Sequence, residues 1–511
     1  MALAAFIITT EIVFLYFMSS AGIEFAVSSI AVTVAVLLQL RFGMREDTLT
    51  PADIVVFIFS WLFLDLAPKI QLLSVPRVLV NTSTVVPELV LVTNLICALF
   101  IVTFTIAYAS LNRRSRIANK GRPANGLNGP ADVLNRRADV RNTPADVLVA
   151  GDVDSAPAPD QFGPVGIGAA VCLCVLLVAA LGRSAYAVDD TPGISPADMI
   201  VHKFLLFLPS ATLLILLHET LRSGRKVLFS RVCVLLLLGI LVALTQNPLT
   251  EKRNGLGPIY LSILFVLFEL KLRTQNRRLI LLLVSMVVIF PAITVLTHHR
   301  AQIATGVPLD AVVSTLKDHY FSTHYDAWAN IYTTVEMVQR QGIHWGQQLL
   351  GSVLFFVPSS LWHAKPLATG IAIGNYLISN YSMWFTNLSA PLVGEAYIDF
   401  GAPGVALYAV ALAWLVTWMN KVAAAGRKWV VFPLMIYGAF FLMFALRGSL
   451  MIAFAYGAGG LLSFLAASAL LSAGSRQIGQ RYFRANVLPL LPGHGRTSRF
   501  EVSSLHHKSR G

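Results

Sequence analysis

The sequence predicts an all-α polytopic integral membrane protein. Hydrophobic residues make up 56% of its 511 residues and charged residues only 13%, whereas soluble domains contain about 25% charged residues. Apolar stretches of roughly 17 to 25 residues recur along the chain, and each is long enough to cross a hydrocarbon core of about 30 Å as a helix. A soluble globular domain is therefore excluded.

We expect about twelve spanning helices. Asp65 and Pro68 shorten the third span, for which a helix lying at the membrane interface is the alternative. The first span has no Lys or Arg before it and contains Glu11, which predicts a retained spanning helix and not a cleaved signal peptide. The predicted spans cover approximately residues 2 to 19, 22 to 40, 53 to 68, 87 to 109, 164 to 182, 199 to 217, 230 to 246, 256 to 270, 279 to 297, 401 to 420, 427 to 446 and 449 to 472.

Basic residues cluster in every second loop between these spans, and such loops stay in the cytoplasm. Both termini are therefore expected in the cytoplasm, and residues 298 to 400 are expected to form one large extracytoplasmic loop. The net charge of +13 is concentrated in these loops and in the tail, residues 473 to 511. Topology and anionic lipid explain this charge, so we expect no nucleic-acid partner.

A polar segment divides the chain. Residues 110 to 163 are rich in Arg, Asn, Ala, Asp, Pro and Gly and contain PADVL twice, at Pro130 and Pro144. This composition predicts a disordered cytoplasmic linker between the first four spans, residues 1 to 109, and spans five to nine, residues 164 to 297. The large loop, the last three spans in residues 401 to 472 and the basic tail follow.

Several kinds of site are not supported by the sequence. All four cysteines lie within predicted spans, which argues against an extracytoplasmic disulfide. The histidines of the large loop fit no zinc-ligand spacing, so we expect no metal and no cofactor. The chain also contains no GxxxxGK phosphate loop and no GxSxG motif, so ATP-driven transport and serine hydrolysis lack support.

We expect the large loop and the charged residues near it to carry the chemistry of the protein. Helical geometry in GEAYIDFG would place Glu395 and Asp399 on one face, at positions i and i+4. Two such carboxylates could share the role of a base, and for Asp399 a solvated carboxylate at a membrane entry point is the alternative. Further charges lie at or within the spans, where each costs about 2.5 to 3.5 kcal/mol unless it is paired or hydrated. These are Glu11, Glu24, Asp65, Lys203 and Arg447, the last at the tight turn between the final two spans.

The order of polar motifs resembles a known family. Asp326 and Gly346 are followed by PSSLWHAKP, from Pro358 to Pro366, and by GEAYIDFGAPG, from Gly394 to Gly404. Together with the hydropathy layout, this stretch of about eighty residues resembles the oligosaccharide repeat-unit polymerases, the Wzy-type O-antigen polymerases. Pro358, Trp362, Lys365 and Pro366 match the first family motif, in which Ser359 replaces an arginine. Glu395, Phe400 and Gly401 match the second.

The resemblance implies a metal-independent membrane glycosyltransferase. It would transfer a glycan chain from an undecaprenyl diphosphate donor to a lipid-linked repeat unit on the outer face of the plasma (inner) membrane. The implied partners are undecaprenyl-diphosphate-linked oligosaccharide and membrane lipid, and a chain-length regulator and a flippase are further candidates. The architecture would be similar to that of the large GT-C-type membrane glycosyltransferases.

Candidate roles follow from this chemistry. A departing diphosphate needs cations, for which Arg447, Lys365, Arg340 and Arg300 are the outward candidates. The acceptor hydroxyl needs a base, which Glu395, Asp326, His363 or Asp399 could supply. Aromatic faces for sugar rings are offered by Trp362, Trp345, Tyr397 and Trp384, although tryptophan and tyrosine also line every membrane interface.

Three other functions compete with this interpretation. An O-antigen ligase would share the donor and the large outward loop and differ only in its acceptor. A glycosyltransferase that uses polyprenyl-phosphate sugars typically has acidic residues in its first outward loop, but here that loop is residues 19 to 22, with only Glu24 nearby. A transporter or lipid-linked oligosaccharide flippase would keep its charges inside the bundle and its outer loops short, and it would show inverted repeats of broken helices.

Overall fold

Helices account for the regular structure in the parts of the chain that the computed structural model describes. These parts are residues 2–18, 23–44, 50–74, 78–120, 162–181, 196–223, 228–247, 253–268, 275–289, 291–292, 308–425 and 429–473. Within them no strand forms, and one isolated bridge pairs Val78 with Thr84. The predicted all-α class is confirmed for these residues.

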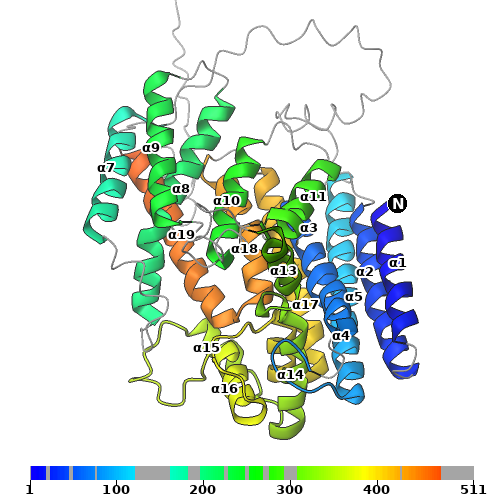
Figure 1. The fold of residues 1–511 in the computed structure, drawn as a ribbon. Coiled ribbons are helices and arrows are strands. Elements are labelled where there is room, and N and C mark those ends of the chain that lie inside the picture. Colours follow the sequence, from blue (N-terminus) through cyan, green and yellow to red (C-terminus); the bar gives the residue numbers. More distant parts are fainter. Residues whose placement is uncertain are drawn as a thin grey trace, which may run out of the picture.

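Most helices run side by side in one bundle (Figure 1). In chain order the helices are α1 (Ala2–Phe17), α2 (Ile23–Met44), α3 (Pro51–Ile58), the π-helix η2 (Phe59–Leu66), α4 (Ala67–Ser74), α5 (Pro87–Lys120), α7 (Pro164–Leu181), α8 (Pro196–Arg222), α9 (Phe229–Thr245), α10 (Arg253–Leu267), α11 (Gln275–Val284), the π-helix η7 (Ser285–Ile289), α13 (Leu309–Tyr320), the 3₁₀ turn η9 (Thr323–Tyr325), α14 (Ala327–Gln341), α15 (Gln347–Val353), α16 (Thr369–Tyr381), α17 (Leu392–Ala425), α18 (Val431–Arg447) and α19 (Leu450–Ser472).

The apolar helices coincide with the predicted spans. Each span overlaps a helix or, for the third and ninth spans, a run of helices. Five helices, α2, α5, α8, α17 and α19, are long and apolar enough to cross a membrane, and α1, α7, α9, α10 and α18 are shorter apolar helices. The fold is consistent with a polytopic membrane protein. Helix α5 continues to Lys120, so the predicted linker begins as helix, and most of its length and the basic tail lie outside the described residues.

The third predicted span lies inside the bundle. Helices α3, η2 and α4 follow one another without a break, and every residue from Pro51 to Asp65 is buried. The helix starts with a capping box, in which the Asp53 backbone N–H donates to Thr50 Oγ1 and the Thr50 backbone N–H donates to Asp53 Oδ2. Protein therefore surrounds this segment, which favours a helix inside the bundle over one lying at the membrane interface.

Helices α14, α15 and α16 gather at one end of the bundle, whereas the described chain begins and α19 ends at the opposite end (Figure 1). Hydrogen bonds join α14 to the bundle, because Trp328 Nε1 donates to Asn94 of α5 at 2.9 Å and Tyr332 OH donates to the Thr84 carbonyl at 2.7 Å. Both aromatic side chains are fully buried. Helix α14 is therefore an internal helix.

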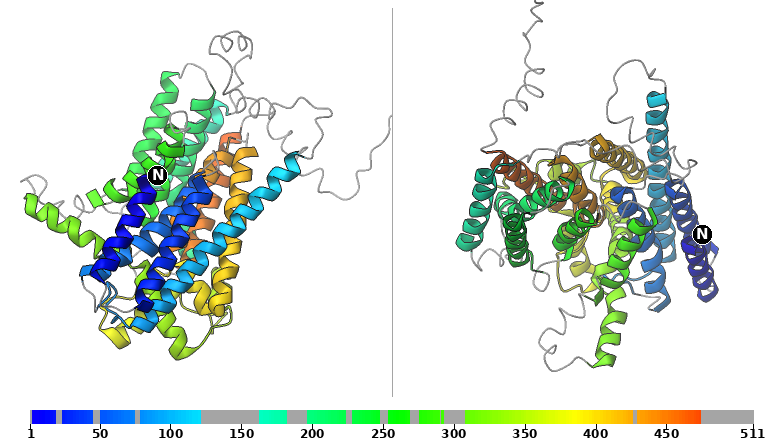
Figure 2. Two further views of the ribbon diagram at one scale, coloured as in Figure 1. Left: turned by 90° about the vertical axis from the view of Figure 1, so that its right-hand side faces the viewer. Right: turned by 90° about the horizontal axis from the view of Figure 1, so that it is seen from above.

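Helix α13 is placed differently. It projects sideways from the bundle, as the light-green helix in the left view of Figure 2 shows, and Leu309 is 78% exposed. The two neighbouring amphipathic helices of the large loop thus have different surroundings, because α14 is buried from Ala327 to Met337, whereas Asp310 and Asp318 of α13 are exposed.

A kink in α17 separates its first residues from its long apolar part. Gly401 has a φ of 64°, in the left-handed region that residues with a Cβ avoid. Beyond the kink, a Cβ on Gly404 would lie 2.2 Å from the Ala396 carbonyl oxygen. The motif GEAYIDFGAPG is therefore a short helical segment, a kink and the start of a long helix.

The close approach at Gly404 gives a stability prediction. In Gly404→Ala the new methyl group would collide with backbone that cannot move aside, so we expect a loss of about 1–3 kcal/mol. The measurement is the thermal unfolding midpoint of the purified protein in detergent. Gly239→Ala is the matched control, because nothing lies within 4 Å of a Cβ there and alanine favours a helix by about 1 kcal/mol over glycine. Equal midpoints for both variants would contradict the kink geometry.

Candidate functional site

Three of the predicted site residues meet at the turn between α18 and α19. Arg447 is the last residue of α18, Ser449 is the N-cap residue of α19, and Leu450 is its first residue. Arg447 contacts Asp326 at the beginning of α14, and Ser449 contacts Glu395 in the first turn of α17. Helices that are far apart in the sequence thus bring Asp326, Glu395 and Arg447 to one place.

Asp326 and Arg447 form a buried ion pair. Arg447 Nη2 lies 3.1 Å from Asp326 Oδ1 and 2.8 Å from the Thr323 carbonyl oxygen. Asp326 is 1% exposed, and it also accepts hydrogen bonds from Ser389 Oγ at 2.6 Å and from Asn330 Nδ2 at 2.9 Å. Additional hydrogen bonds of this kind are what make a buried pair tolerable in a medium of low dielectric constant.

Glu395 is held at the N-terminus of α19. Its Oε1 accepts hydrogen bonds from the Leu450 backbone N–H at 2.8 Å and from Ser449 Oγ at 3.0 Å. A carboxylate is stabilised in this position by the positive end of the helix dipole. Its Oε2 is buried and makes no hydrogen bond to the described residues.

Asp399 has a structural task in the same segment of α17. Its two oxygens accept the backbone N–H groups of Gln348 and Leu349, each at 2.9 Å, and Tyr408 OH donates to Oδ2 at 2.9 Å. Asp399 therefore supplies hydrogen bonds to the first turn of α15. Its side chain is fully buried, so the alternative of a solvated carboxylate is wrong.

The segment PSSLWHAKP forms an exposed loop after α15. His363 is exposed and Trp362 is half-buried. Lys365 Nζ donates to the carbonyl oxygens of Phe355 and Val357, each at 2.7 Å, which closes this loop, and burial lowers the pKa of its ammonium group. At the end of the loop Pro366 packs on Gly351 of α15, whose Cβ would lie 2.5 Å from the proline ring.

The remaining candidates are dispersed. Trp345 and Trp384 are 79% and 74% exposed, whereas Tyr397 is half-buried and packs against the apolar core. Arg340 is exposed, lies 2.7 Å from Glu336 and stacks over Tyr376. The structure does not place these side chains in the cluster around Arg447. Arg300 lies outside the described residues.

The site also contains residues that the sequence did not single out. Ser449, Ser389 and Asn330 complete the hydrogen bonds of Glu395 and Asp326. Ser449 carried a usable signal, because it follows Arg447 and Gly448 directly before an apolar run, where a serine commonly caps a helix. The sequence around Ser389 and Asn330 contains no comparable signal.

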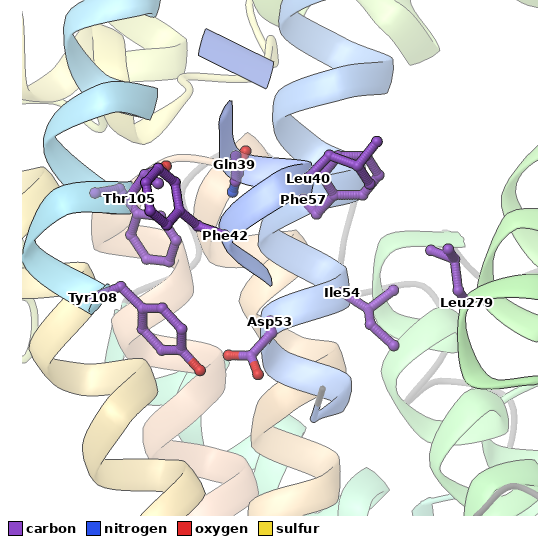
Figure 3. Close-up of a pocket in the computed structure, with 10 residues that line it drawn as sticks. Gln39, Leu40, Phe42, Asp53, Ile54, Phe57, Thr105, Tyr108 and Leu279 are labelled. Carbon is purple, nitrogen blue, oxygen red and sulfur yellow. The ribbon is translucent and has the colours of Figure 1, made fainter. Parts of the chain in front are cut away.

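A small cavity lies elsewhere, where α2, α3 and α5 meet with Leu279 of α11 (Figure 3). Its volume is about 40 Å³, and its lining is mostly apolar. Asp53 and Tyr108 point toward one another at its edge (Figure 3), and Asp53 Oδ1 accepts a hydrogen bond from Asn420 at 3.0 Å. The cavity has room for a water molecule but not for a saccharide, so we do not assign substrate binding to it.

No metal site accompanies these groups. Among the described residues, no group of three His, Cys, Asp or Glu side chains could hold a metal ion.

The position of Asp399 gives a testable prediction. Asp399→Ala would leave the N–H groups of Gln348 and Leu349 and the Tyr408 hydroxyl without their acceptor, at about 1–3 kcal/mol for each group that stays buried. We expect amide hydrogen exchange in α15 to accelerate, as measured by mass spectrometry of peptides covering residues 347 to 353. Unchanged exchange in α15 would show that Asp399 does not hold this helix.

The buried ion pair gives a second prediction. Arg447→Ala would leave Asp326 buried without its cation, which we expect to destabilise the protein by about 3–5 kcal/mol. The double variant Asp326→Asn with Arg447→Ala should recover part of this loss, because no uncompensated charge remains. Thermal unfolding of both variants is the measurement. Arg340→Ala is the comparison and should cost less, because the guanidinium group that it removes is exposed, although its partner Glu336 is buried. Equal loss in the single and the double variant would argue against the pair.

The comparisons with known proteins add no relative. No protein-family model matches the chain, and no curated protein and no solved structure is similar to it. The resemblance to the Wzy-type polymerases therefore rests on the motifs and the hydropathy layout, and the site geometry has to support a function by its own chemistry.

Proposed function

We propose that the protein is a membrane glycosyltransferase that polymerises undecaprenyl-diphosphate-linked oligosaccharide repeat units into a surface polysaccharide. The observation that carries the proposal is the meeting of Glu395 with the pair of Asp326 and Arg447 at the turn between α18 and α19. Glu395, which has one oxygen without a hydrogen bond to the described residues, is held by Ser449 of this turn, and Arg447 lies two residues before Ser449. The motif resemblance supports the same reaction.

The proposed chemistry uses each group in one role. The acceptor hydroxyl oxygen attacks the anomeric carbon, the bond from that carbon to the phosphate oxygen breaks, and undecaprenyl diphosphate leaves with the bonding electrons. The hydroxyl proton passes to Glu395 Oε2. The positive charge of Arg447 stabilises the diphosphate that forms. Asp326 orients the guanidinium group, and Asp399 holds α15 beside the site.

Substrate contacts are proposed at the end of the bundle where α14, α15 and α16 gather (Figure 1). His363 and Lys365 lie on the loop that packs against α15, and Trp345, Trp362, Trp384 and Tyr397 offer aromatic faces to sugar rings. Arg340 is an exposed cation on the same end of the bundle. Because Ser359 replaces the arginine of the family motif, the diphosphate would depend more strongly on Arg447.

The proposed topology has twelve crossing helices in a GT-C-like arrangement and both termini in the cytoplasm. Two observations support it. The ends of α2 and α8 carry basic residues in their last turns, and α14, α15 and α16 lie at the other end of the bundle from the end of α19 (Figure 1). With the basic ends inside, the candidate site faces outward from the plasma membrane of a bacterial cell.

The decisive experiment compares a strain from which the gene is deleted with the same strain after the gene has been restored. Lipid-linked and surface glycans are separated by size. We expect the deletion strain to lose long chains while single repeat units are still made. Long chains of unchanged length stranded on the lipid carrier would indicate a ligase instead, and absence of any extracytoplasmic glycan would indicate a flippase.

Point variants test the site within the same assay. Glu395→Gln should lower polymer formation by about 10²- to 10⁴-fold, the usual contribution of a general base, with the protein inserted at normal levels. Glu88→Gln is the matched control, because Glu88 is exposed at the start of α5. For the cation, Arg447→Lys keeps the charge beside Asp326, so a loss of activity in this variant would reflect diphosphate binding and not misfolding. Full-length polymer from Glu395→Gln would remove Glu395 from the mechanism.

A further inference from the structure

A second cluster of buried charges lies among the first four predicted spans, away from the proposed site. Lys69 of α4 lies 2.5 Å from Glu11 Oε2 of α1 and 2.5 Å from Asp65 Oδ1 of η2. Thr33 and Ser29 of α2 complete the cluster. Glu11 and Lys69 are each 6% exposed and Asp65 is 1% exposed, so the three charged groups share one interior site.

The charges of this cluster do not balance. Two carboxylates face one ammonium group, which leaves one negative charge in excess if both acids are ionised. An uncompensated charge in the interior of a membrane protein costs several kcal/mol. The protein can avoid this penalty by binding one proton or one monovalent cation.

The hydrogen bonds require an additional proton. The three N–H groups of Lys69 are directed to Glu11 Oε2, Asp65 Oδ1 and Thr33 Oγ1, the last at 2.6 Å. Thr33 Oγ1 also lies 2.9 Å from each of the two carboxylate oxygens. A hydroxyl group has a single proton, so Thr33 can donate to only one of them. The other short contact between oxygens is favourable only if that carboxyl group is itself protonated.

We propose that Glu11, Asp65 and Lys69 form a proton-binding site that holds one exchangeable proton on the two carboxyl groups. With this proton bound, the cluster is electrically neutral, and each short contact between two oxygen atoms has a hydrogen-bond donor. Glu11 Oε1 and Asp65 Oδ2 are buried and make no hydrogen bond to the described residues, so either oxygen can receive the proton when the hydrogen bonds rearrange. This proposal does not depend on the proposed glycosyltransferase activity.

Other charged groups near the cluster belong to the helices packed against η2 and α4. Helix α2 has Glu24 and Arg41 at its ends, α3 has Asp53 in its first turn, and α18 ends at Arg447. Further charged or titratable groups with described side chains are Asp326, Glu336 and Arg340 at α14, Asp310, Asp318 and His319 on α13, and the tyrosines Tyr16, Tyr325 and Tyr332. The cations Arg340 and Arg447 are already paired with Glu336 and Asp326, so they do not neutralise the cluster.

The proton site is also in contact with the candidate functional site through η2. Phe63 stacks on Tyr325 with ring centroids 5.4 Å apart, and the Arg447 guanidinium lies 5.8 Å from the Phe63 ring. Gln71 of α4 donates to the Tyr325 carbonyl at 3.1 Å. A change of charge at Asp65 therefore acts on the helix that supports the residue preceding Asp326.

Infrared spectroscopy of the purified full-length protein tests the proposal directly. A protonated carboxyl group absorbs separately from a carboxylate, so spectra are recorded near neutral pH in sodium-free buffer for the wild type, Glu11→Gln and Asp65→Asn. We expect the wild type to have a protonated-carboxyl band that at least one of these variants lacks. Glu24→Gln is the matched control, because Glu24 is exposed outside the cluster. A spectrum unchanged in both cluster variants would overturn the proposal, as would a band that sodium chloride abolishes, since the cluster would then bind a cation.

A second measurement keeps the test independent of spectral assignment. If the folded protein holds a proton that the unfolded chain releases, stability falls as the pH rises, by up to tenfold in the folding equilibrium per pH unit for one proton. Thermal unfolding midpoints between about pH 5 and pH 9, above the reference range of an unfolded carboxyl group, should fall more steeply in the wild type than in Glu11→Gln or Asp65→Asn. Parallel curves would overturn the proposal. Both substitutions preserve side-chain size and leave one carboxylate for Lys69, so folded protein is expected.

Discussion

The buried ion pair between Asp326 and Arg447 organises the end of the bundle that carries the candidate site. It joins the start of α14 to the end of α18, and the end of α18 sets where α19 begins. The start of α19 in turn holds Glu395 through Ser449 and the Leu450 backbone N–H. Each contact depends on the previous one, because a buried carboxylate has no water around it and needs hydrogen-bond donors that are already held in position.

The short first segment of α17 extends this dependence to α15. Gly401 ends the segment with a kink, so Glu395 and Asp399 sit on a short helix that can be angled separately from the long apolar helix beyond it. Glu395 faces the start of α19, and Asp399 faces the start of α15. Two helix N-termini are thereby neutralised by two acids of one segment. The same sequence motif that suggested paired catalytic carboxylates thus assigns them to different partners.

Local sequence features predicted the helices well and their surroundings poorly. Hydropathy located the apolar helices because length and composition are properties of a single segment. The burial of α14 could not be predicted in this way, because its polar face meets Asn81 and Asn94 from distant parts of the chain instead of water. Lys69 was missed for a related reason, since it lies just beyond the predicted third span, and only the continuous helix from α3 to α4 places it between Glu11 and Asp65.

The site residues show the same limit. The sequence singled out Glu395, Asp399, Asp326 and Arg447 as chemically able, and the structure places them around neighbouring helix ends. Their individual tasks depend on partners remote in sequence, such as Gln348 for Asp399 and Ser449 for Glu395. Residue type alone could not show that Asp399 accepts hydrogen bonds from the start of α15, whereas Glu395 keeps one oxygen without a hydrogen bond to the described residues.

The two buried charge clusters solve the same electrostatic problem in different ways. Asp326 meets one cation, and hydroxyl and amide donors satisfy its oxygens, so this pair is neutral without an added proton. Glu11 and Asp65 share one cation, so their cluster needs one further positive charge, which we propose is a proton. On the proposed function, a departing diphosphate would approach Arg447, whose charge Asp326 already balances. The added negative charge would weaken the hold of Asp326 on the guanidinium group. Because η2 carries both Asp65 and Phe63, whose ring lies 5.8 Å from the Arg447 guanidinium, the proposed proton and the substrate charge would act on the same helix.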